Sequence, residues 1–164
     1  GELTPRNWPN ARWVSMAIGA GLLVLVLWVN LTMPWAVIGT SDGFDPRDAG
    51  GALNWPLVIA RALGAALVVP VMEELFWRSF VMRWIQRPQF LTLAPQRVGV
   101  KALLVSAVVF GFEHSLWFAG IVAGLAYGWL YLRSGNLWVP VIAHAVTNGG
   151  LAAWVVVTQQ WQFW

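Results

Sequence analysis

The sequence contains no cysteine, and only 10% of its 164 residues carry a charge. Without cysteine the chain has no disulfide framework, no thiolate nucleophile and no cysteine ligand for a metal. The low charge is matched by 59% hydrophobic residues and 13 tryptophans, which is far from the composition of soluble domains. The composition therefore predicts an integral membrane protein in contact with a lipid bilayer.

The positive charges do not indicate a nucleic-acid partner. The formal net charge is +3, but the lysines and arginines stand beside apolar segments. In such positions they act as anchors that fix the orientation of a membrane protein. We therefore expect no nucleic acid among the partners, and the sequence does not indicate an oligomeric state.

Long apolar segments predict the fold. Residues 13–31 contain no charged residue and would span about one bilayer core as a helix. Residues 55–86 are compatible with one helix longer than a bilayer core, and we expect Pro70 to kink it. Further spans are expected near residues 99–114, 117–132 and 137–158. We predict an all-α fold, a polytopic transmembrane bundle of about five spanning helices.

The loops between these segments differ in charge. Residues 40–54 carry three aspartates among glycine and proline, which predicts a solvated acidic loop, whereas the connection over residues 87–101 is basic. The positive-inside rule then predicts a cytoplasmic N-terminus. We divide the chain into an N-terminal helix with its external loop (1–54), a four-helix core (55–158) and a C-terminal tail (159–164).

Few ionisable residues fall inside the predicted spans. Such groups are costly in a bilayer and by default mark a functional site, although an ion pair that holds helices together is the alternative for any single charge. A cluster on several helices favours the functional interpretation. The residues are Arg61, Glu73, Glu74, Arg78 and Glu113, together with both histidines of the chain, His114 and His144.

Helical spacing groups these residues. Glu74 and Arg78 are four residues apart, so we expect them to pair on one helix face. Glu73 is then left free to face a cavity as a general base. His144 and Asn148 share a face by the same spacing.

The depth of these residues in the membrane is also predictable. Counting about 1.5 Å per residue from the span ends brings Glu73, His114 and His144 to a similar level. We expect this level on the cytoplasmic side of the bilayer or near its midplane. Three separate helices would then contribute to one site.

These residues form three motifs, EExxxR, FxxxH and HxxxN, in that order on three apolar segments. With them, residues 55–158 resemble the CPBP membrane proteins, which include the CAAX prenyl endopeptidases and bacteriocin-processing proteases. Any one motif alone is weak, but the three together form a specific signal. The motifs are Glu73-Glu74-Leu-Phe-Trp-Arg78, Phe110-Gly-Phe-Glu-His114 and His144-Ala-Val-Thr-Asn148.

The resemblance implies an intramembrane endopeptidase of the glutamic type. In this family Glu73 and His114 would activate a water, while His144 and Asn148 would stabilise the oxyanion. Supporting roles would fall to Glu74, Arg78 and Phe110. The implied partner is a membrane-anchored protein or peptide substrate, and the implied location is the bacterial inner (plasma) membrane. Bacterial relatives accompany protein-sorting systems, so we favour cleavage of a C-terminal sorting segment over cleavage of a prenylated peptide.

Other interpretations stay open at this point. We expect no cofactor, but two histidines with Glu73 or Glu113 would also suit a catalytic zinc ion. Haem ligation by the two histidines leaves the other buried charges unexplained. A small transporter or a non-catalytic scaffold would use them for proton relay or helix pairing. Arg61 fits no motif and is interpreted as a structural residue that reaches the membrane interface.

Overall fold

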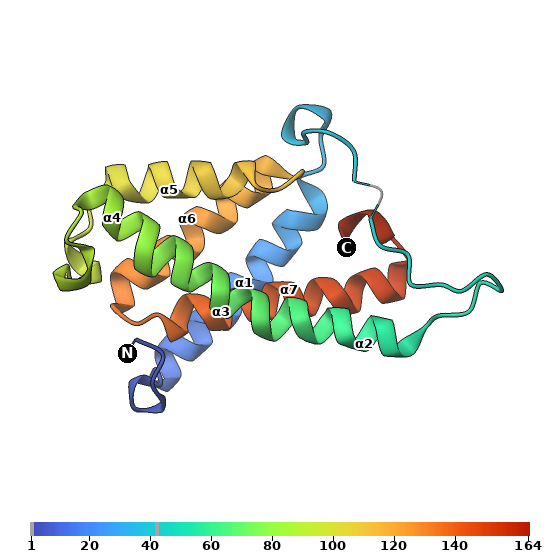
Figure 1. Cartoon of the computed structure of the whole chain (residues 1–164), viewed down its shortest axis with the longest axis horizontal. Helices are drawn as coiled ribbons and strands as arrows, with labels where there is room; N and C mark the ends of the chain where they lie inside the picture. The colour runs from blue at the N-terminus through green and yellow to red at the C-terminus, as the bar shows by residue number, and fades with distance from the viewer. Residues whose placement is uncertain (1, 42) are drawn as a thin grey trace.

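The computed structural model describes residues 2–41 and 43–164, and their regular structure is helical (Figure 1). The α-helices are α1 (Ala11–Asn30), α2 (Trp55–Leu63), α3 (Val69–Glu74), α4 (Arg83–Gln86), α5 (Val100–Phe112), α6 (Trp117–Ser134) and α7 (Trp138–Thr158). Two π-helical segments, Gly64–Val68 and Leu75–Met82, join α2, α3 and α4 into one continuous helix. Short 3-10 turns lie at Pro5–Asn7, Pro34–Ala36, Phe90–Thr92, Pro95–Arg97 and Trp161–Phe163.

The long helix accommodates Pro70, where a kink was predicted, through the wider π-helical segment Gly64–Val68. Pro70 has no backbone N–H, so it cannot donate to a carbonyl in the preceding turn. The N–H of Val69 donates to the carbonyl of Gly64, five residues earlier, which is the π-helical pattern. Such single π turns are often found at functional sites. The helix therefore continues through Pro70 with altered geometry just before Glu73.

Within the described residues, three helices are long and apolar enough to cross a membrane: α1, the continuous helix Trp55–Gln86, and α7. The helical membrane bundle predicted from the sequence is confirmed. The spans expected at 99–114 and 117–132 differ at their ends from α5 and α6. Helix α5 has only 13 residues, so at about 1.5 Å per residue it is shorter than a bilayer core. Helix α6 ends at Ser134, because the next residue, Gly135, has a left-handed backbone (φ +65°).

Small residues let the helices approach closely. A Cβ on Gly124 of α6 would lie 2.9 Å from the Cα of Ala107 in α5. On the other side of the bundle, a Cβ on Gly21 of α1 would collide with the carbonyl of Ala143 in α7. Close approach through small residues is the usual way in which membrane helices pack. Helix α5, with the second motif, therefore packs closely on α6. Helix α7, with the third motif, packs closely on α1.

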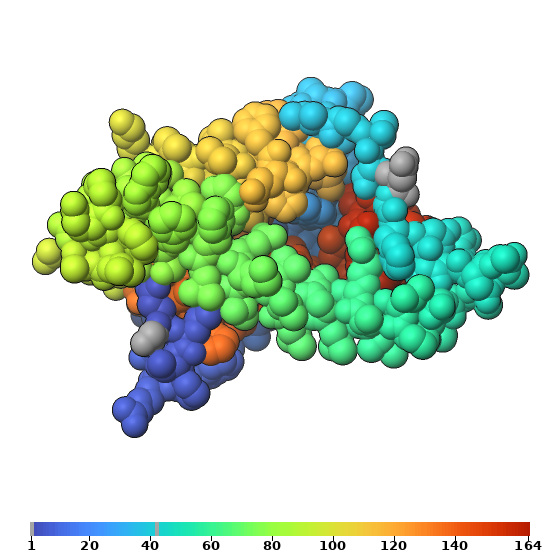
Figure 2. Space-filling model, in the orientation of Figure 1, coloured from blue at the N-terminus to red at the C-terminus, as the bar shows by residue number. Residues whose placement is uncertain are grey.

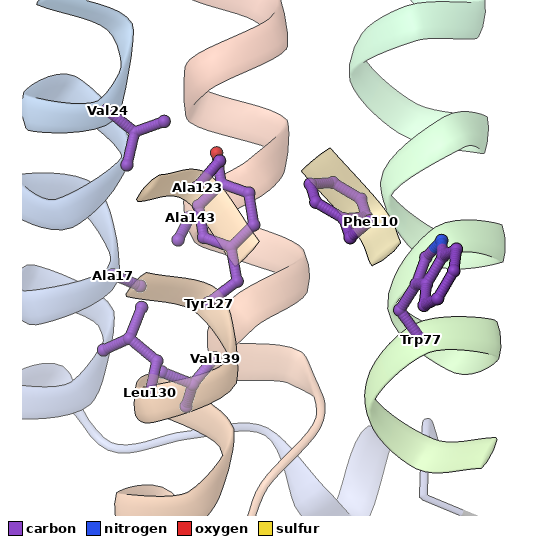
Figure 3. Close-up of a cluster of buried hydrophobic side chains, with 9 residues drawn as sticks. All are labelled: Ala17, Val24, Trp77, Phe110, Ala123, Tyr127, Leu130, Val139 and Ala143. Atoms are coloured by element: carbon purple, nitrogen blue, oxygen red, sulfur yellow. The ribbon is translucent and has the colours of Figure 1, made fainter. Parts of the chain in front are cut away.

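The core between these helices is aromatic on one side and aliphatic on the other. Figure 3 shows Phe110 of α5 lying between Trp77 of the long helix and Tyr127 of α6. The Trp77 and Phe110 ring centroids are 5.9 Å apart. The remaining buried members are Ala17, Val24, Ala123, Leu130, Val139 and Ala143. The second motif therefore begins at a residue that holds α5 against the long helix.

The connections gather at two ends of the bundle. At the first, which we call the N-terminal end, the carboxylate of Glu2 pairs with Arg83 at 3.1 Å, and Arg83 also donates to the carbonyl of Phe90. At the other, the C-terminal end, the indole of Trp117 donates to the carbonyl of Trp35 at 3.1 Å. The N-terminal end comprises residues 2–10, 87–99 and 135–137. The C-terminal end comprises 31–41, 43–54, 113–116 and 159–164.

Candidate active site

The long helix supplies a buried ion pair. The structure brings Glu74 Oε2 to 3.0 Å from Arg78 Nε, and both side chains are almost completely buried. The angles of this contact fall outside hydrogen-bond geometry, and no hydrogen-bond acceptor for the guanidinium is present among the described residues. The guanidinium instead lies over the ring of Phe110, 4.5 Å from its centroid, and near Tyr127. Ion pairing and cation–π contacts together hold Arg78 in the core.

His144 connects α7 to this pair. Its Nδ1 lies 2.9 Å from Glu74 Oε1, and since an ionised carboxylate only accepts, Nδ1 carries the proton in this hydrogen bond. The imidazole stacks on Tyr127 with 5.0 Å between ring centroids. These two contacts fix the ring plane and point Nε2 toward Glu73. Glu74 therefore orients the ring of His144. Functional histidines are commonly oriented in this way, by a hydrogen bond from one ring nitrogen to a carboxylate.

Glu73 is the carboxylate without a fixed partner. Its Oε2 lies 3.9 Å from His144 Nε2, which is too long for a hydrogen bond. This oxygen is buried and has no hydrogen-bond partner among the described residues. One turn of the helix thus carries two adjacent glutamates with different environments, one paired and one available for chemistry.

His114 follows the last turn of α5. Its Nδ1 lies 3.0 Å from the carbonyl oxygen of Phe110, and a carbonyl only accepts, so Nδ1 is the donor. The Nε2 of a neutral ring is then an acceptor. The edge of Trp28 from α1 packs against the imidazole at 5.3 Å between centroids. The i,i+4 spacing of the FxxxH motif therefore sets the orientation of this histidine through the backbone of Phe110.

Asn148 has a contact that the sequence did not predict. Its Nδ2 donates to the carbonyl of Ala65 at 2.9 Å. In the π-helical pattern this carbonyl would accept from residue 70, but Pro70 has no N–H, and the N–H of Val69 is already bound to Gly64. Asn148 therefore satisfies a carbonyl that the proline leaves without a backbone partner. The second N–H of the amide is not used in this bond.

One cavity of about 470 Å³ joins these residues. In the space-filling view, atoms of α1 and α7 are visible in a hollow between α2 and the end of α5 (Figure 2). All four predicted catalytic residues line the cavity, together with Phe110, whereas Glu74 and Arg78 lie behind it. The lining comprises Trp28, Arg61, Gly64, Ala65, Val69, Glu73, Phe110, His114, Ala123, Tyr127, His144, Thr147, Asn148, Leu151, Phe163 and Trp164.

The cavity extends to the C-terminal end of the bundle. Glu73, His114 and His144, which the sequence analysis expected at a similar depth, all line it, and so do Arg61, Phe163 and Trp164. The sequence analysis gave no role to the C-terminal tail, whose Phe163 packs against Trp154 of α7 at 5.2 Å between ring centroids.

Tyr127 and Thr147 were missed by the sequence analysis, because Tyr127 lies in no motif and Thr147 is one of the unspecified positions of HxxxN. The hydroxyl of Tyr127 donates to Thr147 Oγ1 at 2.7 Å, and Thr147 lies 2.9 Å from the carbonyl of Gly21. This chain of contacts joins α6, α7 and α1 beneath His144. Glu113, in contrast, is exposed and accepts from the indole of Trp77 at 3.1 Å.

The described residues do not fit a zinc site well. No group of three or more His, Asp or Glu side chains within residues 2–41 and 43–164 is arranged to hold a metal ion. One nitrogen of His144 is engaged with Glu74, and Glu74 is shared with Arg78. These two contacts reduce the donors that His144 and Glu74 could offer to a metal ion.

Fold and site together define a polytopic helical membrane protein with a buried cluster of glutamate, histidine, asparagine and arginine around one cavity. Residues 54–150 match the family described as Type II CAAX prenyl endopeptidase Rce1-like, and the chain belongs to this family. The CPBP resemblance is thereby confirmed.

A curated protein of Bacillus subtilis (strain 168), named "Putative membrane peptidase YdiL", is 29% identical over 98 residues. The match covers 57% of this chain and 35% of that relative, so the chain spans about a third of the relative's length. No solved structure matches the chain.

Proposed function

We propose that this protein is an intramembrane endopeptidase of the glutamic type. The observation that carries the proposal is the carboxylate of Glu73, which has an unpartnered buried oxygen and faces His144 across a cavity that His114 and Asn148 also line. Membership of a family named for endopeptidases supports the same reaction. A scaffold that only paired helices would have no need for a carboxylate without a partner, because such a group destabilises the fold.

In the proposed reaction, a water between Glu73 and His114 attacks the carbonyl carbon of the scissile bond. Glu73 accepts a proton from the water as the new carbon–oxygen bond forms, and the carbonyl electron pair moves to its oxygen. His114 Nε2 accepts a hydrogen bond and aligns the water, a role that its Nδ1 contact with Phe110 supports. When the carbon–nitrogen bond breaks, Glu73 returns the proton to the leaving amine.

The oxyanion would lie on the side of His144 and Asn148. Donation from His144 Nε2 requires a ring that carries both protons, and Glu74 accepts one of them at Nδ1. Asn148 offers the N–H that is not bound to Ala65. Donors held in place before the reaction stabilise developing charge more than mobile ones. Arg78 fixes Glu74, so its role is to position His144 through that carboxylate.

The cavity extends to Arg61, Phe163 and Trp164, which favours a substrate that arrives at the C-terminal end of the bundle. Six basic residues lie at the N-terminal end or in the helix turns next to it: Arg6, Arg12, Arg87, Arg97, Lys101 and Arg133. The other end carries Asp45 and Asp48 with Arg47. The positive-inside rule supports a cytoplasmic N-terminal end. A prenylated cytosolic protein would then arrive at the end of the bundle that lies away from Arg61, Phe163 and Trp164. We therefore propose a substrate with a C-terminal membrane segment that is cut for protein sorting or maturation in the bacterial plasma membrane.

The test compares Glu73→Gln with Glu113→Gln, a change of the same size at the exposed glutamate that accepts from Trp77. Membranes from cells with each variant are analysed by mass spectrometry for new C-termini. We expect the substrate cuts to disappear with Glu73→Gln and to persist with Glu113→Gln, while both proteins keep the wild-type unfolding temperature. Cleavage at the wild-type rate by folded Glu73→Gln would show that this mechanism is wrong.

A further inference from the structure

Arg61 is a charged lining residue of the cavity to which the proposed chemistry gives no role. It lies on α2, twelve residues before Glu73 on the same continuous helix, and its side chain is exposed. Its neighbours on α2, Leu57, Ile59 and Leu63, are exposed large hydrophobic residues, as expected for a lipid-facing surface. A lone cation on such a helix is costly unless something compensates its charge.

Among the described residues, the side chains found against the charge of Arg61 are aromatic. The guanidinium carbon of Arg61 lies 4.8 Å from the ring centroid of Phe44 and 5.7 Å from that of Trp164. Within residues 2–41 and 43–164, Arg61 forms neither an ion pair nor a hydrogen bond with any side chain. The nearby aspartate of the loop, Asp45, is bound to Arg47. Two rings therefore hold the guanidinium in place, and its N–H donors have no side-chain acceptor among the residues that the structure describes.

We propose that Arg61 binds a carboxylate of the peptide substrate at the mouth of the cavity. Guanidinium groups bind carboxylates through two parallel hydrogen bonds, and stacking on aromatic rings leaves these in-plane donors free. The carboxylate is either the C-terminus of the peptide or an acidic side chain, which share the same chemistry. The assignment rests on the proposed peptide-cleaving function, and it adds a specificity-determining residue to that site.

The spacing fixes how far this carboxylate lies from the bond that is cut. Twelve residues of helix separate Arg61 and Glu73 by about 18 Å along the axis. Both side chains lean toward the N-terminus of the helix, so this separation is kept. An extended peptide covers about 3.3 Å per residue. The carboxylate recognised by Arg61 is therefore about five residues from the scissile bond.

The experiment measures binding, so it does not depend on turnover. Fluorescein-labelled decapeptides of alternating alanine and leucine are prepared with a free C-terminal carboxylate or a C-terminal amide. A second pair, both amidated, carries glutamate or glutamine as the last residue. Fluorescence anisotropy in detergent gives Kd, and every protein carries Glu73→Gln so that the peptide is not cut. The proteins compared have Arg61, Arg61→Lys or Arg61→Gln. The control is Arg133→Gln, at an exposed arginine near the opposite end of the bundle.

We expect the carboxylate form of at least one pair to bind about tenfold more tightly than its neutral partner, as is usual for a charge-assisted contact. The pair that shows the preference identifies the source of the carboxylate. Arg61→Gln should remove the preference without changing the affinity of the neutral peptide, Arg61→Lys should keep part of it, and Arg133→Gln should keep all of it.

A purely structural Arg61 would lower the unfolding temperature on substitution but leave the ratio of the two affinities unchanged, and this outcome overturns the proposal. Equal affinity within both pairs, or no binding of either carboxylate peptide, also overturns it. Cleavage is measured separately with Glu73 intact. If the preference depends on Arg61 but no peptide or membrane protein is cut, the carboxylate site stands and the proposed hydrolysis fails.

Discussion

The buried contact between Glu74 and Arg78 allows a quantitative prediction for Arg78→Met. Methionine keeps most of the packing over Phe110 but leaves Glu74 as a buried carboxylate whose remaining hydrogen-bond partner is His144. Both side chains of the pair are at most 1% exposed, so solvent does not screen the loss. Removing one partner of a buried pair costs about 3–5 kcal/mol. For a chain of this size, that loss lowers the unfolding temperature by about 10 °C.

Two further variants separate the charge from the packing. In the double variant Arg78→Met with Glu74→Gln, neither position of the pair carries a charge and the amide oxygen still accepts from His144. We expect the double variant to recover at least half of the lost stability. The control is Arg47→Met, which breaks the exposed ion pair with Asp45 and should leave the unfolding temperature almost unchanged.

Tryptophan fluorescence during heating in detergent reports unfolding in all of these proteins, since the chain has 13 tryptophans. If the double variant is less stable than Arg78→Met alone, the uncompensated carboxylate is not the cause of the loss. The destabilisation would then come from the missing cation–π contacts with Phe110 and Tyr127.

Three other predictions concern the site and its orientation. Asn148→Ala should slow cleavage by about 10²–10³-fold, as for loss of one oxyanion donor. It should also lower the free energy of unfolding by about 1–3 kcal/mol, because the carbonyl of Ala65 loses its donor. Unchanged stability would contradict this second role of Asn148. Cleavage should persist after exhaustive treatment with a metal chelator, and activity restored only by added zinc would reject the metal-independent mechanism. Reporter fusions should locate the N-terminus in the cytoplasm and the C-terminus outside, and the reverse result would remove the argument for a sorting substrate.

The sequence was most informative where a helical spacing determines a contact. The i,i+4 rule correctly predicts that Glu74 and Arg78 meet, because both lie on one uninterrupted stretch of helix. It also brings Phe110 and His114 together, although the contact is through the backbone carbonyl. Apolar run length predicts the helical membrane bundle, but it overestimates α5, whose last turn ends at Phe112.

The sequence predicted that three helices share one site, but it did not predict several individual contacts between distant segments. Tyr127 of α6 stacks on His144 of α7, and no local pattern marks that tyrosine as a site residue. Arg61 was interpreted as a structural residue near the interface, since the sequence does not reveal that Trp164 folds back beside it. The bond from Asn148 to Ala65 follows from the absent N–H of Pro70 only once α7 is known to pack there.

The two adjacent glutamates have separate tasks because of helix geometry. Neighbouring residues on a helix point about 100° apart, so Glu74 turns toward Arg78 on its own helix while Glu73 turns toward the cavity. His144 stands between them: its Nδ1 is bound to Glu74, and its Nε2 faces Glu73. An exchange of the two roles would leave Arg78 without its anion. One carboxylate is therefore committed to holding the histidine, and this commitment leaves the other free for a water.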